Sequence, residues 1–305
     1  MRSIDRRLFL GTSAGVAAGL TGMTQLQSAE SPAAAPPAPP LVPLGNTGIQ
    51  LSRLGQGTGV RGSNRQSDQT RMGYEKLVPL FRHAYDRGIR FFDLADLYGS
   101  HVYFREALKT MARDEVAILT KIWWRYDGPT DESTPPWRKQ VALTTIERFL
   151  HEIDTDYLDV VLLHCLQKAD WQQELQPYME ALDEAKQKGQ VRAVGVSCHD
   201  LGALETAAES PWVDVILARI NPGGVKMDGT QEEILGVLRR AKKNGKAVLG
   251  MKIFGEGQLV DQREACIQFA QESGVLDAMT IGFDTPAQID EVLELIHRHP
   301  AKQLA

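Results

Sequence analysis

The chain has 305 residues, of which 43% are hydrophobic and 24% are charged, and its formal net charge is -5. This is an ordinary globular composition, and the length suits either two domains or one α/β barrel of about 250 residues. The negative balance disfavours nucleic-acid binding. Three cysteines without CxxC or metal-ligand spacing exclude a zinc module and a disulfide scaffold.

The first 29 residues are predicted to be an export signal. Asp5-Arg6-Arg7-Leu8-Phe9-Leu10 opens an uncharged stretch to Met23, which is shorter than a membrane span requires. The paired arginines resemble the twin-arginine (Tat) signal, which carries folded proteins across the bacterial inner membrane. An ordinary basic start before a buried helix is the alternative. We therefore expect recognition by the Tat translocase and a periplasmic location, or a membrane tether if the signal is retained.

A linker and a hairpin are predicted before the main domain. Residues 30–43 contain six prolines, which predict an extended, semi-rigid spacer. The segment Leu41–Ser52 reads as two short strands around the turn Gly45-Asn46-Thr47-Gly48, a hairpin that would plug the bottom of a barrel. The barrel domain itself is assigned to residues 44–300.

From residue 53 onward, short apolar runs alternate with amphipathic segments. The predicted strands are Arg53–Thr58, Ile89–Asp93, Val116–Lys121, Tyr157–His164, Val191–Ser197, Val213–Arg219, Ala247–Met251 and Leu276–Ile281. The predicted helices include Tyr74–Arg87, Arg138–Ile153, Trp171–Lys188, Gln231–Asn244, Gln262–Ser273 and Pro286–His297. Glycines at 88, 189, 245 and 274 stand where helices typically end. This pattern predicts an α/β fold, the parallel (β/α)8 TIM barrel, over a doubly wound sheet, because no GxGxxG follows the first strand.

Three of the predicted strands end in a polar residue that is costly to bury. These residues are Asp93, Lys121 and His164. One such residue alone is often a satisfied structural group, but strand ends of a parallel barrel meet at one mouth, where active sites lie. Tyr98 follows Asp93 by five residues, in a loop that reaches over the same mouth.

These four side chains suit the protonation of a carbonyl oxygen. A phenol has an ordinary pKa of about 10, and a nearby ammonium lowers it. We expect Lys121 to lower the pKa of Tyr98, Asp93 to pair with Lys121, and His164 to donate to the substrate oxygen. The hydride must come from a bound cofactor, because no side chain supplies one.

The stretch Phe92-Asp93-Leu94-Ala95-Asp96-Leu97-Tyr98-Gly99-Ser100, with Lys121 and His164 downstream, resembles the aldo-keto reductase superfamily. The likeness covers residues 41–300 and implies a barrel that binds NAD(P)H and acts on a small carbonyl or alcohol. It implies that Tyr98 is the general acid, tuned by Lys121 and Asp93, and that His164 orients the carbonyl. Cofactor residues implied by the resemblance are Gly57, Thr58, Asp93, Ser197 and Thr285.

The chain departs from this family pattern around the cofactor. Cys198 replaces an asparagine that holds the nicotinamide carboxamide, and the glutamine expected on the next strand is missing. The loop after the strand ending at Met251 resembles a pyrophosphate loop, in which backbone amides near Gly255 and Gly257 and the charge of Lys252 would bind phosphate.

The positions that bind the 2′-phosphate in NADPH-using family members are Gly282 and Gln288 here, in place of lysine and arginine. We therefore expect weak discrimination between the nucleotides or a preference for NADH, unless Lys252 reaches the phosphate. Asp284 and Asp290 would repel a phosphate if they face the pocket.

Together these features predict an exported oxidoreductase that reduces carbonyls or oxidises alcohols with NAD(P)(H) and holds no metal. The alternative is a nucleotide-binding barrel with little or no turnover that serves as a regulatory subunit.

Overall fold

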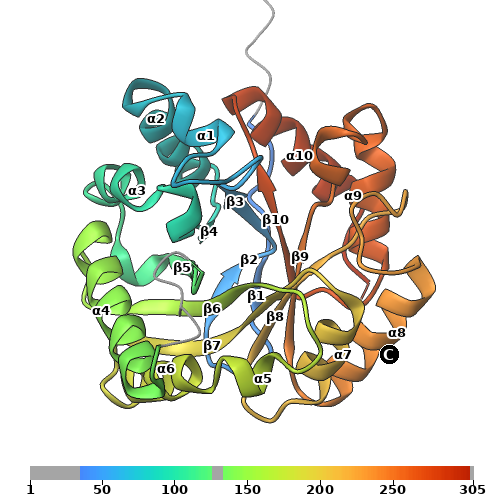
Figure 1. The fold of residues 1–305 in the computed structure, drawn as a ribbon. Helices are drawn as coiled ribbons and strands as arrows, with labels where there is room; N and C mark the ends of the chain where they lie inside the picture. The colour runs from blue at the N-terminus through green and yellow to red at the C-terminus, as the bar shows by residue number, and fades with distance from the viewer. Residues whose placement is uncertain (1–34, 126–132, 303–305) are drawn as a thin grey trace, which may run out of the picture. The chain divides into compact units, whose positions relative to one another are not determined.

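The computed structural model describes residues 35–125 and 133–302, which form an α/β barrel (Figure 1). Its parallel strands close in the order β10-β3-β4-β5-β6-β7-β8-β9. The strands are β3 Leu54–Gly57, β4 Phe91–Asp93, β5 Ala117–Ile122, β6 Leu158–Leu166, β7 Val191–Cys198, β8 Val215–Arg219, β9 Ala247–Met251 and β10 Ala278–Gly282. The predicted signal at 1–29, with Arg6 and Arg7, lies outside the described residues.

Helices surround the strands in chain order, and α10 returns to pack beside α2 (Figure 1). They are α1 Asp68–Arg71, α2 Tyr74–Asp86, α3 His101–Leu108, α4 Pro135–Ile153, α5 Trp171–Glu174, α6 Gln176–Gln187, α7 Leu201–Glu209, α8 Gln231–Lys243, α9 Arg263–Glu272 and α10 Pro286–Arg298. Within the described ranges, no helix has the length and apolar character that a membrane crossing requires.

The predicted (β/α)8 barrel is confirmed, with local differences. The predicted helix Trp171–Lys188 is two helices, α5 and α6, because Pro177 in the first turn of α6 suits a helix start and cannot continue the preceding one. The glycines at 88, 189, 245 and 274 all adopt positive φ directly after a helix, as their positions predicted.

An antiparallel hairpin, β1 Leu41–Pro43 and β2 Gln50–Ser52, precedes the barrel. Its apolar side chains Leu44, Ile49 and Leu51 are fully buried and pack with the residues inside the barrel. The hairpin therefore fills the lower end of the barrel, and β1 occupies the last three residues of the segment predicted as linker.

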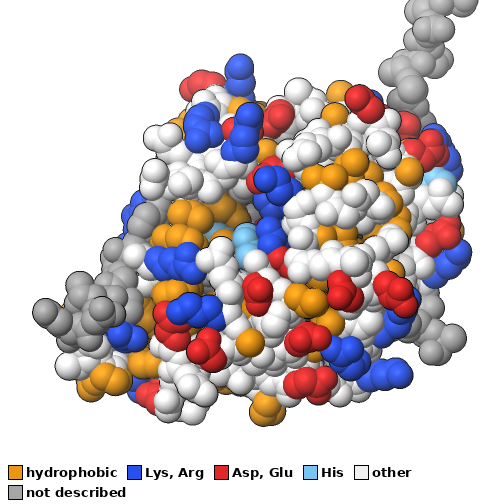
Figure 2. All heavy atoms as spheres, turned by 45° about the vertical axis from the view of Figure 1, so that its right-hand side comes forward, with side chains coloured by type: hydrophobic (Ala, Val, Ile, Leu, Met, Phe, Trp, Pro, Cys, Tyr) orange, Lys and Arg blue, Asp and Glu red, His pale blue; other side chains and the backbone are white. Residues whose placement is uncertain are grey.

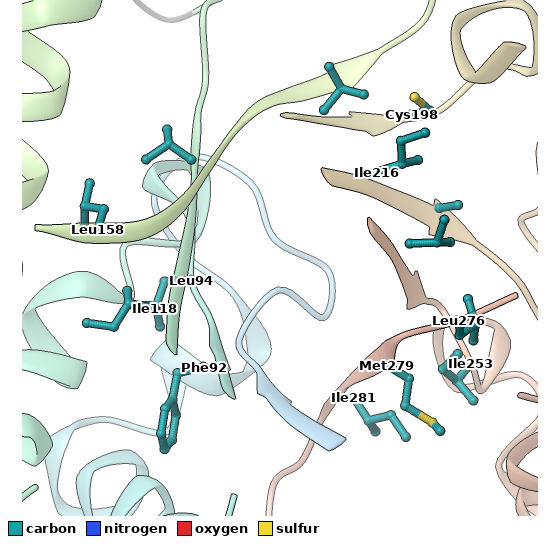
Figure 3. Packing of buried hydrophobic residues seen from close by; sticks show 14 of the residues in the cluster. Phe92, Leu94, Ile118, Leu158, Cys198, Ile216, Ile253, Leu276, Met279 and Ile281 are labelled. Carbon is teal, nitrogen blue, oxygen red and sulfur yellow. The ribbon is translucent and has the colours of Figure 1, made fainter. Parts of the chain in front are cut away.

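Side chains along each strand alternate between the barrel interior and the layer under the helices. Phe91, Leu119 and Leu162 fill the interior. The intervening residues face the helices, and several of them, including Phe92, Ile118 and Ile216, are labelled in Figure 3. Because side chains alternate with period two, the next inward residue on these strands is Asp93, Lys121 or His164. The alternation thus directs all three polar groups into the mouth.

Candidate active site

Four side chains from neighbouring strands and one loop meet at the C-terminal mouth of the barrel. Asp93 ends β4, Lys121 lies near the end of β5 and His164 lies near the end of β6. Tyr98 ends a single 3₁₀ turn, Asp96–Tyr98, that follows β4. The hydroxyl of Tyr98 lies 3.2 Å from Nε2 of His164. Both polar atoms therefore point toward one position, where a substrate oxygen would receive two hydrogen bonds.

Lys121 and Asp93 form a buried ion pair beneath Tyr98. Their exposed fractions are 1% and 6%, and the ammonium donates to the Asp93 carboxylate and, at 2.9 Å, to the carbonyl of Leu94. The Lys121 nitrogen lies 5.0 Å from the centre of the Tyr98 ring. The ammonium is thus held against the ring of Tyr98 by two acceptors, one at the end of β4 and one directly after it.

The turn that carries Tyr98 is fixed from below by a chain of ion pairs. Arg148 on α4 binds the buried carboxylate of Asp96 through two nitrogens, at 3.0 and 2.9 Å. Arg148 also donates to Glu152 at 2.8 Å, and Glu152 lies 2.7 Å from Nδ1 of His101. Because Asp96 is two residues before Tyr98, this network restrains the position of the tyrosine ring.

Two glycines of the loop after β3 allow that loop to lie directly on Tyr98. A Cβ at Gly59 would come 2.4 Å from Cζ of Tyr98, and one at Gly62 would come 2.4 Å from Cδ1. Such distances are shorter than the non-bonded contacts that carbon atoms make in proteins, so a larger residue at either position would displace the ring or the loop. The loop after β3 therefore packs against Tyr98 only because these two positions are glycine.

The prediction that Lys121 lowers the pKa of Tyr98 is wrong for this structure. Burial raises the pKa of Tyr98 well above its usual range, and the negative charge of Asp93 raises it further. The carboxylate of Asp93 pairs with the ammonium of Lys121 and so balances its charge. Tyr98 therefore keeps its proton throughout the neutral range, as a proton donor must.

His164 is neutral in the same site. Burial lowers its pKa well below the usual range, and the positive charge of Lys121 lowers it further. Among the described residues, none hydrogen-bonds to its buried Nδ1 atom. Its backbone carbonyl accepts a hydrogen bond from the Trp124 indole at 3.1 Å. The Trp123 ring contacts the His164 imidazole ring edge-on. The imidazole is thus available to donate one N–H without carrying a charge.

A cavity of about 500 Å³ opens beside these groups. It runs from Asp93, Tyr98 and His164 to Gln288 and Glu291 on α10. Figure 2 shows a hollow on this face in which a histidine lies next to Lys or Arg side chains. The volume falls within the range of about 300 to 1,000 Å³ that is typical of ligand pockets.

Four of the predicted cofactor residues line this cavity, namely Gly57, Asp93, Lys252 and Gly257. The other four bond to the protein itself. Thr58 donates to the backbone carbonyl of Asp93 at 2.8 Å, and Ser197 accepts from the amide of Cys165 at 3.0 Å. Thr285 caps the start of α10, and Gly255 packs against Val225. Those four residues lie outside the cavity lining and make contacts within the protein.

The amides predicted to cradle a phosphate are already bonded within their loop. The N–H of Gly255 donates to the carbonyl of Lys252 at 2.8 Å, and the N–H of Gly257 donates to that of Phe254 at 3.0 Å. Of the groups predicted to bind phosphate in this loop, the side chain of Lys252 is the one that offers a positive charge to the cavity.

The far end of the cavity carries an ion pair that the sequence did not reveal. Arg263, at the start of α9, lines the cavity and pairs with Glu291 at 2.5 Å. Asp284 also lines the cavity, whereas Asp290 pairs with Arg87 at 2.8 Å and is not part of the lining. Helix α9 thus brings a cation, Arg263, into the same lining as Gln288 from outside the local sequence.

Gly282 lines the same end beneath the loop after β3. A Cβ at this position would come 2.5 Å from Cγ2 of Val60 and 3.1 Å from Nε2 of Gln69. A lysine at this point would therefore require the loop to move, so the loop and the glycine fit each other.

Cys165 and His199 are cavity residues that sequence reasoning did not assign to the site. Sγ of Cys165 lies 3.5 Å from Nε2 of His199, and both side chains face the cavity near His164. Burial raises the pKa of the thiol to about 11 and lowers that of His199 to about 3, so both are neutral. Cys198, at the predicted asparagine position, lies instead in the outer core (Figure 3).

The cavity residues fit a nicotinamide dinucleotide. Small residues at Gly57, Gly257 and Gly282 leave room along the wall, and Lys252 offers a cation for a phosphate. The buried hydroxyl of Thr280, which also lines the cavity, has no hydrogen-bond partner in the described part of the chain. An unpaired buried hydroxyl is costly, so it marks a point where a ligand gains a hydrogen bond.

Residues 53–302 match the family model described as Aldo/keto reductase family. The match covers most of the chain, which therefore belongs to the aldo/keto reductase family. The chain is 28% identical over 227 residues to L-galactose dehydrogenase of Arabidopsis thaliana, covering 72% of this chain and 66% of that protein. It is 28% identical over 174 residues to versiconal hemiacetal acetate reductase of Aspergillus parasiticus, covering 50% and 49%. In general the chain spans about half the length of the curated relatives it matches.

Solved structures share this fold. An aldo-keto reductase of Bombyx mori in complex with NADP superposes with a TM-score of 0.63 at 18% identity, covering 88% of this chain and 90% of that one. At this identity the likeness establishes the barrel and does not by itself assign substrate or cofactor to this chain.

Proposed function

We propose that this protein is an NAD(P)(H)-dependent oxidoreductase that reduces aldehydes or ketones, or oxidises the corresponding alcohols. The observation that carries the proposal is the convergence of the Tyr98 hydroxyl and the His164 imidazole, 3.2 Å apart, on the wall of a 500 Å³ cavity. Membership of the aldo/keto reductase family supports the same reaction class.

In this proposal, the protein controls the proton and the position of the substrate oxygen. Tyr98, whose raised pKa keeps it protonated, donates its proton to the oxygen as negative charge develops there. Neutral His164 donates a hydrogen bond to the same oxygen and fixes its direction. The buried pair of Lys121 and Asp93 packs against the Tyr98 ring and helps to hold it in place.

The cofactor would lie along the cavity, with Gly57, Asp93 and Lys252 as contacts. When bound, it supplies or accepts the hydride, which no side chain can do. We further propose that the protein discriminates weakly between NADH and NADPH or favours NADH. Gly282 has no room for a lysine, and Arg263 is already paired with Glu291.

The location is also a proposal. Arg6 and Arg7 at the start of an uncharged stretch support Tat-dependent export to the periplasm. This route carries folded proteins, so the nucleotide would be bound before export and retained in a compartment where it is scarce.

Replacement of Tyr98 by Phe tests the catalytic assignment. The variant should fold normally and lose carbonyl reduction by about 100- to 10,000-fold, because the ring remains and the proton source is removed. Turnover should be measured with a panel of aldehydes and ketones, and nucleotide binding by fluorescence titration. Wild-type turnover in the variant would refute the role of Tyr98. Tight nucleotide binding by wild-type protein without turnover on any carbonyl would instead favour the regulatory-subunit alternative.

A further inference from the structure

One carboxylate lies between two ammonium groups at the edge of the cavity. Oε1 of Glu256 accepts from Nζ of Lys252 at 2.6 Å, and Oε2 of the same side chain lies 3.9 Å from Nζ of Lys226. Lys252 and Glu256 both line the cavity. Two positive charges and one negative charge therefore leave this cluster, Lys226–Lys252–Glu256, with an excess of one positive charge.

The backbone holds the cluster in a fixed arrangement. All three residues adopt left-handed conformations, with φ of 58° at Lys226 and Lys252 and 59° at Glu256. The buried side chain of Asn221 donates to the carbonyls of Val225 and Lys252 and accepts from the amide of Val225. Non-glycine residues in this conformation are strained and persist only where surrounding contacts hold them. The loops after β8 and β9 are thus tied together, and the two lysines are positioned by the fold.

The Glu256 side chain has more freedom than the backbone that carries it. It is one-quarter exposed, and the hydrogen bonds it accepts come from a side chain and not from the backbone. The amides of Gly255 and Gly257, on either side, are used within the loop. An anion that enters the cavity at this point meets Lys252 with the carboxylate of Glu256 already bound to it.

We propose that Glu256 competes with the cofactor for Lys252. In the ligand-free protein, the carboxylate of Glu256 is bound to the ammonium of Lys252. This ion pair must break before a phosphate of the nicotinamide cofactor binds to Lys252. This inference rests on the proposed function, which supplies the phosphate. Affinity for the nucleotide is therefore set by an exchange of anions on Lys252 and not by a vacant cation.

The size of the effect follows from the exposure of the pair. Partly exposed ion pairs contribute little to stability, so releasing Lys252 from Glu256 should tighten phosphate binding by about two- to fivefold. The same exchange requires the gain to depend on Lys252, because without the ammonium there is nothing to compete for.

The test is a titration of NADH and NADPH against the mature protein and the Glu256→Gln variant, read by nucleotide fluorescence. Glu256→Gln should bind both nucleotides about two- to fivefold more tightly than wild type. The inhibition constant of inorganic pyrophosphate, obtained from its competition with NADH, should be about two- to fivefold lower for this variant than for wild type. Glu184→Gln is the matched control, because Glu184 also pairs with lysines, at 2.8 and 3.0 Å, but lies on α6 outside the cavity lining. The Glu184→Gln control should leave the dissociation constants for NADH and NADPH unchanged.

A double-mutant cycle completes the test. Lys252→Met should weaken binding, and Glu256→Gln should give no gain in the Lys252→Met background. Thermal melts establish that each variant is folded before titration. Weaker or unchanged binding in Glu256→Gln, or pyrophosphate that displaces NADH from neither protein, would overturn the inference. Absence of any nucleotide binding by wild type would instead refute the proposed function.

Discussion

The buried pair Asp93–Lys121 permits a stability prediction that does not depend on the substrate. Lys121 is 1% exposed and Asp93 6% exposed, and the ammonium has two acceptors, the Asp93 carboxylate and the carbonyl of Leu94. Removing one partner of a buried pair typically costs about 3 to 5 kcal/mol, because the other charge is left without compensation. Replacing both with apolar groups is often close to neutral.

The two single replacements should differ because the cavity reaches only one partner. Asp93 lines the cavity, whereas Lys121 is not part of the lining. In Lys121→Met, water in the cavity can solvate the remaining carboxylate, so we expect a loss of about 1 to 3 kcal/mol. In Asp93→Leu, the ammonium keeps only the Leu94 carbonyl, so we expect about 3 to 5 kcal/mol.

The assay is urea unfolding of residues 30–305 followed by circular dichroism, with the free energy of unfolding obtained by linear extrapolation. The double variant, which carries both Asp93→Leu and Lys121→Met, should lose less free energy of unfolding than the Asp93→Leu variant. This difference gives a favourable coupling energy of about 2 kcal/mol or more between the two residues. Additive losses in the double variant would refute the reasoning, because they would mean that neither charge depends on the other for its burial.

Three further predictions concern pH, nucleotide choice and export. Because the pKa of Tyr98 is raised and that of His164 is lowered, kcat/KM for reduction should stay level between about pH 6 and 9. The rate of oxidation should rise with pH as the phenol loses its proton. A fall in the reduction rate centred within that pH range would contradict the two assignments. Titration should give dissociation constants for NADH and NADPH within about tenfold of each other or favour NADH, and NADPH binding more than tenfold tighter would assign the 2′-phosphate to Lys252 or Arg263. Arg6→Lys with Arg7→Lys should retain folded precursor in the cytoplasm on cell fractionation, and normal export of this variant would indicate the general secretory route.

Most of the fold was accessible from the sequence because local signals agreed with one another. The glycines at 88, 189, 245 and 274 end α2, α6, α8 and α9, and the apolar runs between helices are the strands. Helices α1, α3 and α7 were not identified from the sequence. Each is short. Asp200 precedes α7 and caps it, because its side chain accepts from the amide of Ala203.

The positions of Asp93, Lys121 and His164 could be predicted because strand alternation carries them into one mouth. The pKa of Tyr98 could not be predicted in the same way. The direction of its shift depends on how deeply the phenol is buried and on the nearby charge of Asp93, and residue types alone give neither. Ser197 illustrates the same limit, because its hydroxyl bonds the amide of Cys165 and holds that residue at φ 60° in place of facing the cavity.

The pairing of charges in the cavity could not be inferred from the composition of the chain. Three cations line it within the described ranges, and each is paired with a carboxylate: Lys252 with Glu256, Arg263 with Glu291, and Arg61 with Asp68. A cavity built in this way presents little net field to an approaching dinucleotide. We therefore expect an incoming phosphate to displace a carboxylate from its cation, so that the acids of these pairs affect nucleotide affinity as well as the cations.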